Sequence, residues 1–236
     1  MQVAKGKKES VRQMFNNIAG KYDFLNHFLS AGIDKRWRRR VGRIIAAAKP
    51  GKVLDVATGT ADLAIELARH TKAEIIGVDI ADAMLDVGRK KIEDKGLNGQ
   101  IQLFQGDSEN LPYKQDDYDV AMVAFGVRNF EDLNRGLSEM CRVIKPGGLV
   151  VVLEFSQPRK FPVRQVYRLY FKHVLPRVGR LVSRDKGAYT YLPESVDAFP
   201  DGPDFLSVME KAGFGHLAEE RLTFGIATIY IGIKNP

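Results

Sequence analysis

The sequence predicts an α/β fold of the doubly wound type, in which helices cover both faces of a mostly parallel sheet. Five short apolar stretches alternate with stretches of helical periodicity through the middle of the chain. The apolar stretches are nearly continuous in Val, Ile and Leu, which is typical of parallel strands buried on both faces. The length of 236 residues suits one such domain with an insertion and is ample for a hydrophobic core.

The individual elements follow from these patterns in chain order. The predicted strands cover residues 52–57, 74–80, 101–107, 118–125 and 149–155. Helical patterns cover residues 61–70, 81–96 and 131–148, and the last of these helices is expected to stop at the Pro-Gly-Gly of residues 146–148. Residues 216–234 are predicted to form a closing hairpin that turns at Phe224 and Gly225, which brings the sheet to seven strands.

Two segments lie outside this core pattern. Residues 1–49 look helical and basic, and we expect them to form an N-terminal helical cap on a domain of residues 50–236. Residues 157–200 are a long connection after the fifth strand, where we expect a helical lid insertion. A basic amphipathic helix is predicted there, either packed on the body or facing a partner, with one face formed by Val163, Val166, Tyr167, Tyr170, Phe171 and Val174 and another by Arg164, Arg168 and Lys172.

The net charge of +7 is unevenly distributed along the chain. Residues 1–49 carry a net +9 and residues 157–186 a net +8, so the remainder is acidic. Basic segments of this kind suit polyanions such as nucleic acid or an anionic membrane surface, or serve only as a solvated surface. The single Cys141, the absence of an apolar leader and the absence of a run long enough to span a bilayer lead us to expect a cytoplasmic protein.

The turn after the first predicted strand indicates what kind of ligand the sheet holds. Its sequence, VLDVATGTADLA at residues 53–64, has a single glycine, Gly59, between Asp55 and Asp62. The glycine fingerprint for a pyrophosphate and the Walker A pattern with its lysine are both absent. Asp55 at the strand end would repel a phosphate and favour a cation, so a ligand without phosphate is expected beyond the carboxyl ends of the strands.

Acidic residues also end the second and third predicted strands. Asp79 is placed to accept hydrogen bonds from a ribose diol, and Asp107 to accept from an adenine amine beside the Ser108 backbone. Together with the acid of the first strand, this set suits an adenosine that carries a sulfonium, as in S-adenosylmethionine. Because that cofactor has no phosphate, one glycine at the closest approach, Gly59, suffices.

Three segments make the chain similar to a known family. They are YDFLNHFLSAGIDKRWR at residues 22–38, FGVRNFED at residues 125–132 and RVIKPGGLVVVLEFS at residues 142–156. On these motifs the chain resembles the ubiquinone/menaquinone biosynthesis C-methyltransferase family, from about Val11 to Ile233. The resemblance implies a Rossmann-like class I S-adenosylmethionine-dependent methyltransferase fold. The chain departs from the family at Asp34, where His is frequent, and at residues 58–61, where Gly-Gly-Thr-Gly is frequent.

The resemblance also implies the residues of the site. Family cofactor contacts carry over to Thr60, Asp79, Asp107 and Ser108, and a backbone contact carries over to Ala124; Asp55 and Gly59 join them from the loop analysis. The family's catalytic network carries over to Tyr22, Arg128 and Asn129. In this network we expect Arg128 to stabilise a developing phenolate and Asn129 to orient the ring oxygen. A water molecule or Tyr22 would take the proton.

The implied reaction is S-adenosylmethionine-dependent C-methylation of a polyprenylated quinol. The chain looks more like the menaquinone members, which favours 2-demethylmenaquinol as acceptor, with the benzoquinol intermediate of ubiquinone biosynthesis as the alternative. A polyprenylated acceptor implies transient contact with the inner face of the membrane, as a peripheral protein. A homodimer is compatible with the sequence, which leaves the oligomeric state open.

Rival classes are weaker. A nucleic-acid methyltransferase often shows Asn/Asp-Pro-Pro-Tyr after the fourth strand, where this chain has FGVRNF, so no nucleic-acid partner is expected. A nicotinamide dehydrogenase lacks its glycine fingerprint here. A non-enzymatic adenosine-binding module remains a third alternative. The four histidines have no metal-ligand spacing, so no metal is expected, and Cys141 is expected in the core.

Overall fold

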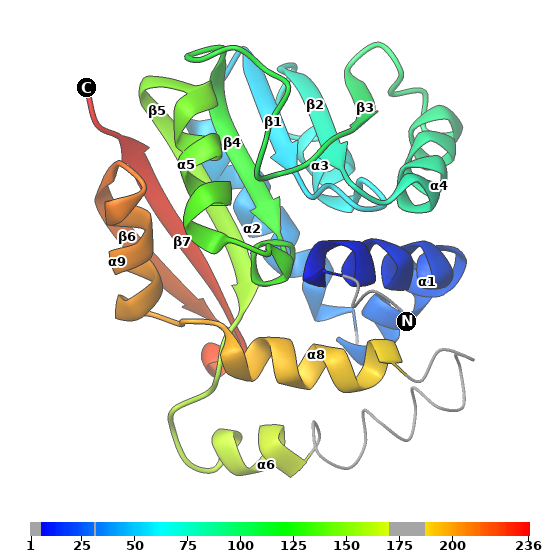
Figure 1. Cartoon of the computed structure of the whole chain (residues 1–236), viewed down its shortest axis with the longest axis vertical. Coiled ribbons are helices and arrows are strands. Elements are labelled where there is room, and N and C mark those ends of the chain that lie inside the picture. The colour runs from blue at the N-terminus through cyan, green and yellow to red at the C-terminus, as the bar shows by residue number, and fades with distance from the viewer. Residues whose placement is uncertain (1–5, 31, 170–186) are drawn as a thin grey trace.

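The computed structural model describes residues 6–30, 32–169 and 187–236, and its centre is one twisted sheet (Figure 1). The strand order is β3-β2-β1-β4-β5-β7-β6. The first five strands pair in parallel, whereas β7 is antiparallel to both β5 and β6. The strands are β1 Lys52–Val56, β2 Glu74–Asp79, β3 Ile101–Gln105, β4 Tyr118–Ala124, β5 Ile144–Phe155, β6 Phe214–Leu222 and β7 Ala227–Lys234. The predicted doubly wound, mostly parallel, seven-stranded sheet is therefore confirmed.

Helices cover both faces of the sheet, as the buried strands require. Their bounds are α1 Lys7–Leu29, α2 Ile33–Ala47, α3 Asp62–Leu67, α4 Asp82–Asp94, α5 Leu133–Val143, α6 Val163–Leu169, α8 Gly187–Ala198 and α9 Pro203–Lys211. One core cluster joins α2, α3 and α4 to the sheet, with Ile45 packed among residues such as Val53. A second cluster joins α5 and α9 to the opposite face, where Leu137 and Cys141 are buried with Leu54. Cys141 is thus a core residue, as expected.

Helices α1 and α8 lie beyond the carboxyl ends of the parallel strands, and α6 lies farther out (Figure 1). Helix α1 packs mainly on α4, and it also contacts α8. Its Lys8 reaches the loop that follows β3, where it pairs with Asp107. Helix α8 contacts the short helix η1, Val127–Asn129, which follows β4. The N-terminal segment and the insertion therefore meet at the end of the sheet where ligands bind in open α/β folds.

The boundary between α5 and β5 differs from the prediction. The helix ends at Val143 rather than at the Pro-Gly-Gly, and β5 already begins at Ile144, which is extended and pairs with Tyr118. The physical reason is Pro146, which disfavours helical geometry at the preceding Lys145 and ends the helix early. The register then shifts between Tyr118 and Val120, which accommodates the Pro-Gly-Gly within the strand. The closing hairpin is confirmed, with its turn in the short helix η3, Thr223–Gly225.

The insertion after β5 is helical in its described parts, α6 and α8. The predicted amphipathic helix is described only as far as Leu169, so Tyr170, Phe171, Lys172 and Val174 lie outside the described residues. Within α6, Val166 and Leu169 are exposed rather than packed on the body. Among the described residues no helix is long and apolar enough to cross a bilayer.

Candidate active site

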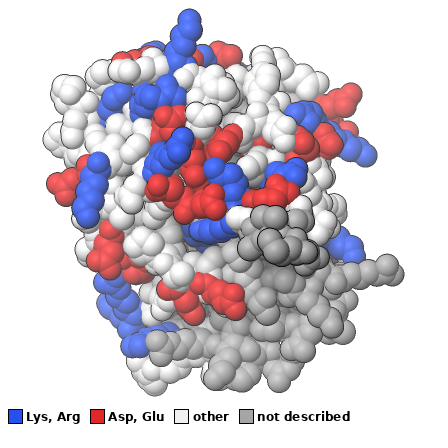
Figure 2. Space-filling model, in the orientation of Figure 1, with Lys and Arg blue, Asp and Glu red and all other residues white. Residues whose placement is uncertain are grey.

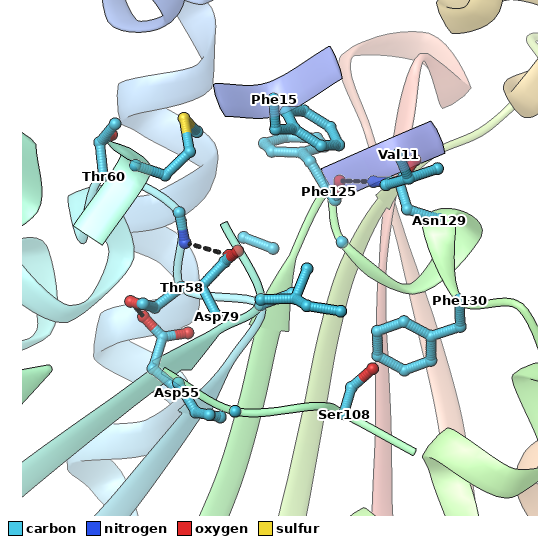
Figure 3. Close-up of a pocket in the computed structure, with 18 of the residues that line it drawn as sticks. Val11, Phe15, Asp55, Thr58, Thr60, Asp79, Ser108, Phe125, Asn129 and Phe130 are labelled. Atoms are coloured by element: carbon cyan, nitrogen blue, oxygen red, sulfur yellow. Dashed lines mark hydrogen bonds between the residues drawn. The ribbon is translucent and has the colours of Figure 1, made fainter. Parts of the chain in front are cut away.

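A pocket at the carboxyl ends of β1, β2, β3 and β4 collects the predicted cofactor residues (Figure 3). All seven of them line it: Asp55, Gly59, Thr60, Asp79, Asp107, Ser108 and Ala124. Two of the three predicted catalytic residues, Tyr22 and Asn129, line the same pocket, whereas Arg128 does not. Arg128 instead borders a second cavity, between η1 and α8, together with Tyr191.

The glycine loop after β1 is held in place by Asp79. One oxygen of the Asp79 carboxylate accepts from the Gly59 amide at 2.8 Å, and the other accepts from the Ala81 amide at 2.9 Å. Gly59 has φ of +56°, a conformation that side chains rarely adopt. Burial raises the pKa of Asp79 above its ordinary value, although the backbone donors oppose this shift. Asp79 therefore shapes the loop as well as offering its remaining lone pairs to the pocket.

Asp55 is the most deeply buried acid of the pocket. Its side chain accepts a hydrogen bond from the Thr58 hydroxyl at 2.6 Å, inside the same turn. Burial raises its pKa to about 7, and the nearby Asp79 adds to the shift. Asp55 is therefore partly protonated near neutral pH, and a cation placed beside it would favour the ionised form.

Asp107 is engaged by helix α1. Lys8 pairs with Asp107 at 2.8 Å and with Glu109 at 3.1 Å, and the other oxygen of Asp107 accepts from the Glu109 amide. Figure 2 shows acidic and basic side chains interleaved over this face of the molecule. Part of the basic N-terminal segment thus finds its anionic partners within the chain, on the acidic body.

The cofactor loop is also tied to α1 through Thr60. The Thr60 hydroxyl donates to Asp23 of α1 at 2.5 Å, and Lys91 of α4 contacts the other oxygen of Asp23 at 2.7 Å. Lys91 also pairs with Asp62 at the start of α3. The sequence analysis missed these partners, because they lie tens of residues apart and no local spacing links them.

Aromatic and apolar side chains form the wall opposite the acids. Figure 3 shows Phe15 and Val11 of α1 facing the pocket, with Phe125 beside them and Phe130 nearer Ser108. Tyr22 stands with its ring edge against Phe15, at a centroid separation of 5.8 Å. Helix α1 therefore forms a wall of the pocket. It carries Tyr22 to a site whose strand-end residues lie more than 30 positions later in the chain.

The turn after β4 is held by a network of side chains. Arg128 donates to the Glu154 carboxylate at 2.7 Å and to the Phe125 carbonyl at 2.6 Å. Asn129 donates to the same carbonyl at 3.3 Å and accepts from the Tyr191 hydroxyl at 3.0 Å. Both members of the Arg128–Glu154 pair are buried, and burial raises the pKa of Glu154 while Arg128 opposes the rise. The Nε atom of Arg128 is buried and meets no acceptor among the described residues.

Glu154 and Tyr191 were not identified from the sequence as site residues. Glu154 interrupts the apolar run of β5, and an acid inside a buried strand was a usable signal for a buried partner. Tyr191 carried no comparable signal, because its contact with Asn129 spans 62 residues.

The donor set tests whether S-adenosylmethionine fits this pocket. Three acids lie at or near the ends of successive strands. Gly59 lines the pocket with backbone atoms alone, and the thioether of Met84 and aromatic rings supply apolar walls. Carboxylate acceptors match ribose hydroxyls, an adenine amine and a positive sulfonium, so the residues fit the group. Among the described residues, no cluster of His, Cys, Asp and Glu suits a metal ion.

The comparison with solved structures agrees with the fold. A SAM-dependent methyltransferase from Thermotoga maritima superposes with a TM-score of 0.60 at 19% identity, covering 91% of this chain and 98% of that one. Such a likeness shows the fold alone. The fold is that of class I S-adenosylmethionine-dependent methyltransferases, and the pocket lies at its carboxyl edge.

The family follows from the sequence comparisons. Residues 1–234 match the ubiE/COQ5 methyltransferase family, and the chain belongs to it. A relative from Bacteroides fragilis, named demethylmenaquinone methyltransferase, is 45% identical over 97% of this chain and 94% of its own length. A relative from Geobacter sulfurreducens, named ubiquinone/menaquinone biosynthesis C-methyltransferase UbiE, is 47% identical over 97% of this chain and 90% of its own length. The family resemblance seen in the sequence motifs is confirmed.

Proposed function

We propose that this chain transfers a methyl group from S-adenosylmethionine to a ring carbon of a polyprenylated quinol, converting 2-demethylmenaquinol to menaquinol. The observation that carries the substrate assignment is the 45% identity, over nearly the full length of both chains, with the relative named demethylmenaquinone methyltransferase. The pocket supports it, because cofactor-type acids on one side face apolar and aromatic walls on the other.

The cofactor, when bound, supplies an activated methyl group for attack by a carbon nucleophile. We assign its binding to Asp79, Asp107 and Ser108 around the adenosine, with Gly59 and Ala124 giving backbone contacts and Thr60 holding the loop. Asp55 contributes its negative charge once ionised. The helical cap and the insertion are proposed to enclose this site, since α1 already forms one wall.

On the acceptor side, the chain must hold a ring hydroxyl that loses its proton. Loss of that proton places negative charge on the oxygen and on the ring carbon that attacks the methyl group. We assign Asn129 to the ring oxygen, because it lines the pocket and has an amide donor. Arg128 does not line this pocket. It donates to the Phe125 carbonyl and to Glu154, and in this role it holds the turn that carries Asn129. Tyr22 or a water molecule receives this hydroxyl proton. Once the methyl group has bonded to the ring carbon, that carbon loses its hydrogen as a proton and the ring oxygen regains one, so the aromatic quinol is restored and one proton in total passes to solvent.

The test is a direct assay of the full chain with methyl-deuterated S-adenosylmethionine and chemically reduced acceptors. Demethylmenaquinol and the benzoquinol precursor are offered separately and then in competition, and the products are weighed by mass spectrometry. We expect deuterated menaquinol as the main product. A protein that binds the cofactor but labels neither quinol would overturn the proposal and favour an adenosine-binding module.

The benzoquinol acceptor is the second candidate, because the Geobacter sulfurreducens relative carries both pathways in its name. Preferential labelling of the benzoquinol in the competition assay would select it. The methylation step is the same for the two acceptors, since both rings carry a hydroxyl beside the carbon that is methylated.

We further propose that the insertion contacts the membrane transiently, because a prenyl tail resides in the bilayer. Support comes from Phe161, Val166 and Leu169, which are exposed apolar residues of the insertion, beside the exposed Arg164. Co-sedimentation with anionic vesicles should exceed that with neutral ones, and it should fall in the triple variant Arg164→Glu, Arg168→Glu, Lys172→Glu. Equal sedimentation of both proteins with both vesicles would remove the membrane role. A homodimer remains a prediction for light scattering.

A further inference from the structure

The contact between Tyr191 and Asn129 links the insertion to the turn after β4. Tyr191 lies on α8, and its hydroxyl reaches the Asn129 side-chain oxygen at 3.0 Å. Both side chains are partly buried, where a hydrogen bond is better formed than in water. Burial raises the pKa of Tyr191, so its hydroxyl stays protonated and remains a donor.

The partners of Asn129 determine how its amide is turned. The Phe125 carbonyl can only accept a hydrogen bond, so the nitrogen of the Asn129 amide must face it, at 3.3 Å. The amide oxygen then faces Tyr191, whose hydroxyl can donate. An amide nitrogen carries two hydrogens, and the carbonyl uses one of them. The other is available at a residue that lines the cofactor pocket.

The Phe125 carbonyl alone does not hold this arrangement firmly. It already accepts from Arg128 at 2.6 Å, which is shorter than its 3.3 Å contact with Asn129. The Tyr191 hydroxyl therefore supplies the shorter of the two hydrogen bonds that orient the Asn129 amide. Figure 3 shows Asn129 beside Phe125, with the hydrogen bond between them at the edge of the pocket.

We infer that Tyr191 is a positioning residue for methyl transfer, which fixes the Asn129 amide so that its second N–H faces the ring oxygen of the acceptor. The inference rests on the proposed function and adds to it a residue from the insertion. The orientation of the Asn129 amide matters for the reaction, because the ring oxygen gains negative charge as its proton leaves. A donor that is already oriented stabilises that charge without reorganisation.

The first test replaces Tyr191 with Phe, which removes only the hydroxyl. We expect kcat with demethylmenaquinol to fall roughly tenfold, the effect of losing one modest hydrogen bond. The Kd for S-adenosylmethionine should stay unchanged, because the cofactor acids are untouched. The Tm should fall by at most about 2–4 °C, because only one partly buried hydrogen bond is lost. The matched control is Tyr113→Phe, since the Tyr113 hydroxyl is buried away from the site without a hydrogen-bond partner among the described residues.

A double-mutant cycle separates positioning from an independent role. In an Asn129→Ala background, Tyr191→Phe should cause no further loss of kcat, because Tyr191 acts through Asn129. An equally large loss of kcat in the Asn129→Ala background would overturn the inference, and so would an unchanged kcat in Tyr191→Phe itself. In either case the parent protein still methylates the quinol, so the proposed function is unaffected.

A second measurement does not depend on the acceptor. In ¹⁵N-labelled protein, the Asn129 side-chain amide signals, assigned through Asn129→Ala, should shift in Tyr191→Phe and stay in place in Tyr113→Phe. Unchanged signals in Tyr191→Phe would refute the contact whatever the substrate is. If the parent protein methylates no quinol but the signals shift, the proposed function and the assignment of Tyr191 to methyl transfer fail, and only the contact stands.

Discussion

The proposed cofactor side and the proposed acceptor side of the pocket are built in different ways. On the cofactor side, backbone amides hold an acid, since Asp79 at the end of β2 accepts from the amides of Gly59 and Ala81. On the acceptor side, side chains hold one another, as in the buried pair of Arg128 and Glu154. The first arrangement depends on where a strand ends, and the second depends on contacts between side chains that are distant in the sequence.

This difference predicts different consequences of mutation. Changes on the cofactor side should mainly alter the affinity for S-adenosylmethionine, because its acids lie at or near strand ends that the sheet continues to hold. Changes on the acceptor side should alter stability and turnover, because removing one partner leaves another buried group unsatisfied. The predictions below test the comparison in order of decreasing expected effect.

The largest effect is expected for Glu154→Ala on the acceptor side. It leaves the Arg128 guanidinium buried without its counter-charge, which should lower the free energy of unfolding by about 3–5 kcal/mol. Urea denaturation followed by circular dichroism measures this. Glu220→Ala is the matched control, since Glu220 forms an exposed pair with Arg40 and its loss should change little. Similar small losses in both variants would mean that the buried pair does not hold the turn.

Asp55→Asn is expected to remove a pH dependence on the cofactor side. The pKa of Asp55 is about 7 in the folded protein and near 4 when unfolded, so the folded state binds the extra proton between these values. Stability of the parent protein should therefore fall as pH rises from 4 to 7, relative to the variant, by on the order of 2–4 kcal/mol. The exposed Asp86→Asn serves as control. Parallel stability curves for parent and Asp55→Asn would contradict the raised pKa.

Asp79→Ala should weaken cofactor binding. Losing a charged acceptor should cost about 1.5–3 kcal/mol, or roughly 10–150-fold in affinity, measured by calorimetric titration with S-adenosylmethionine. Two backbone donors also lose their partner, so the loop conformation is expected to loosen. Asp86→Ala, on the exposed face of α4, is the control. An unchanged affinity would remove Asp79 from the cofactor site.

The smallest effect is expected for Lys8→Gln, where α1 joins the two sides. Its pairs with Asp107 and Glu109 are about one-third exposed on the lysine side, so each contributes less than about 1 kcal/mol. We expect S-adenosylmethionine to associate and dissociate roughly 2–5-fold faster, because α1 is a wall of the pocket. Stopped-flow fluorescence of the single Trp37, which packs near Phe125, reports this. Rates equal to those of the exposed Lys95→Gln control would show that Lys8 does not restrain α1.

The sheet and the acids that line the pocket could be predicted from the sequence, because both depend on local patterns. Continuous apolar runs mark the buried strands, and an acid directly after such a run lies at the carboxyl edge of the sheet. Asp55, Asp79 and Asp107 therefore fell into one pocket as expected. The predicted end of α5 is wrong by a few residues, because Pro146 disfavours helical geometry before it and the helix already ends at Val143.

The tertiary structure alone decided which side chains hold the site together. Arg128 was expected at the acceptor, but the structure turns it to Glu154 behind the pocket wall, and Asn129 takes its orientation from Tyr191. Lys8 and Asp23 of α1 likewise reach Asp107 and Thr60 only after the chain has folded. The physical reason is that hydrogen bonds and ion pairs between distant segments leave no periodic signal in the sequence. They depend on distances that the packed sheet and helices set.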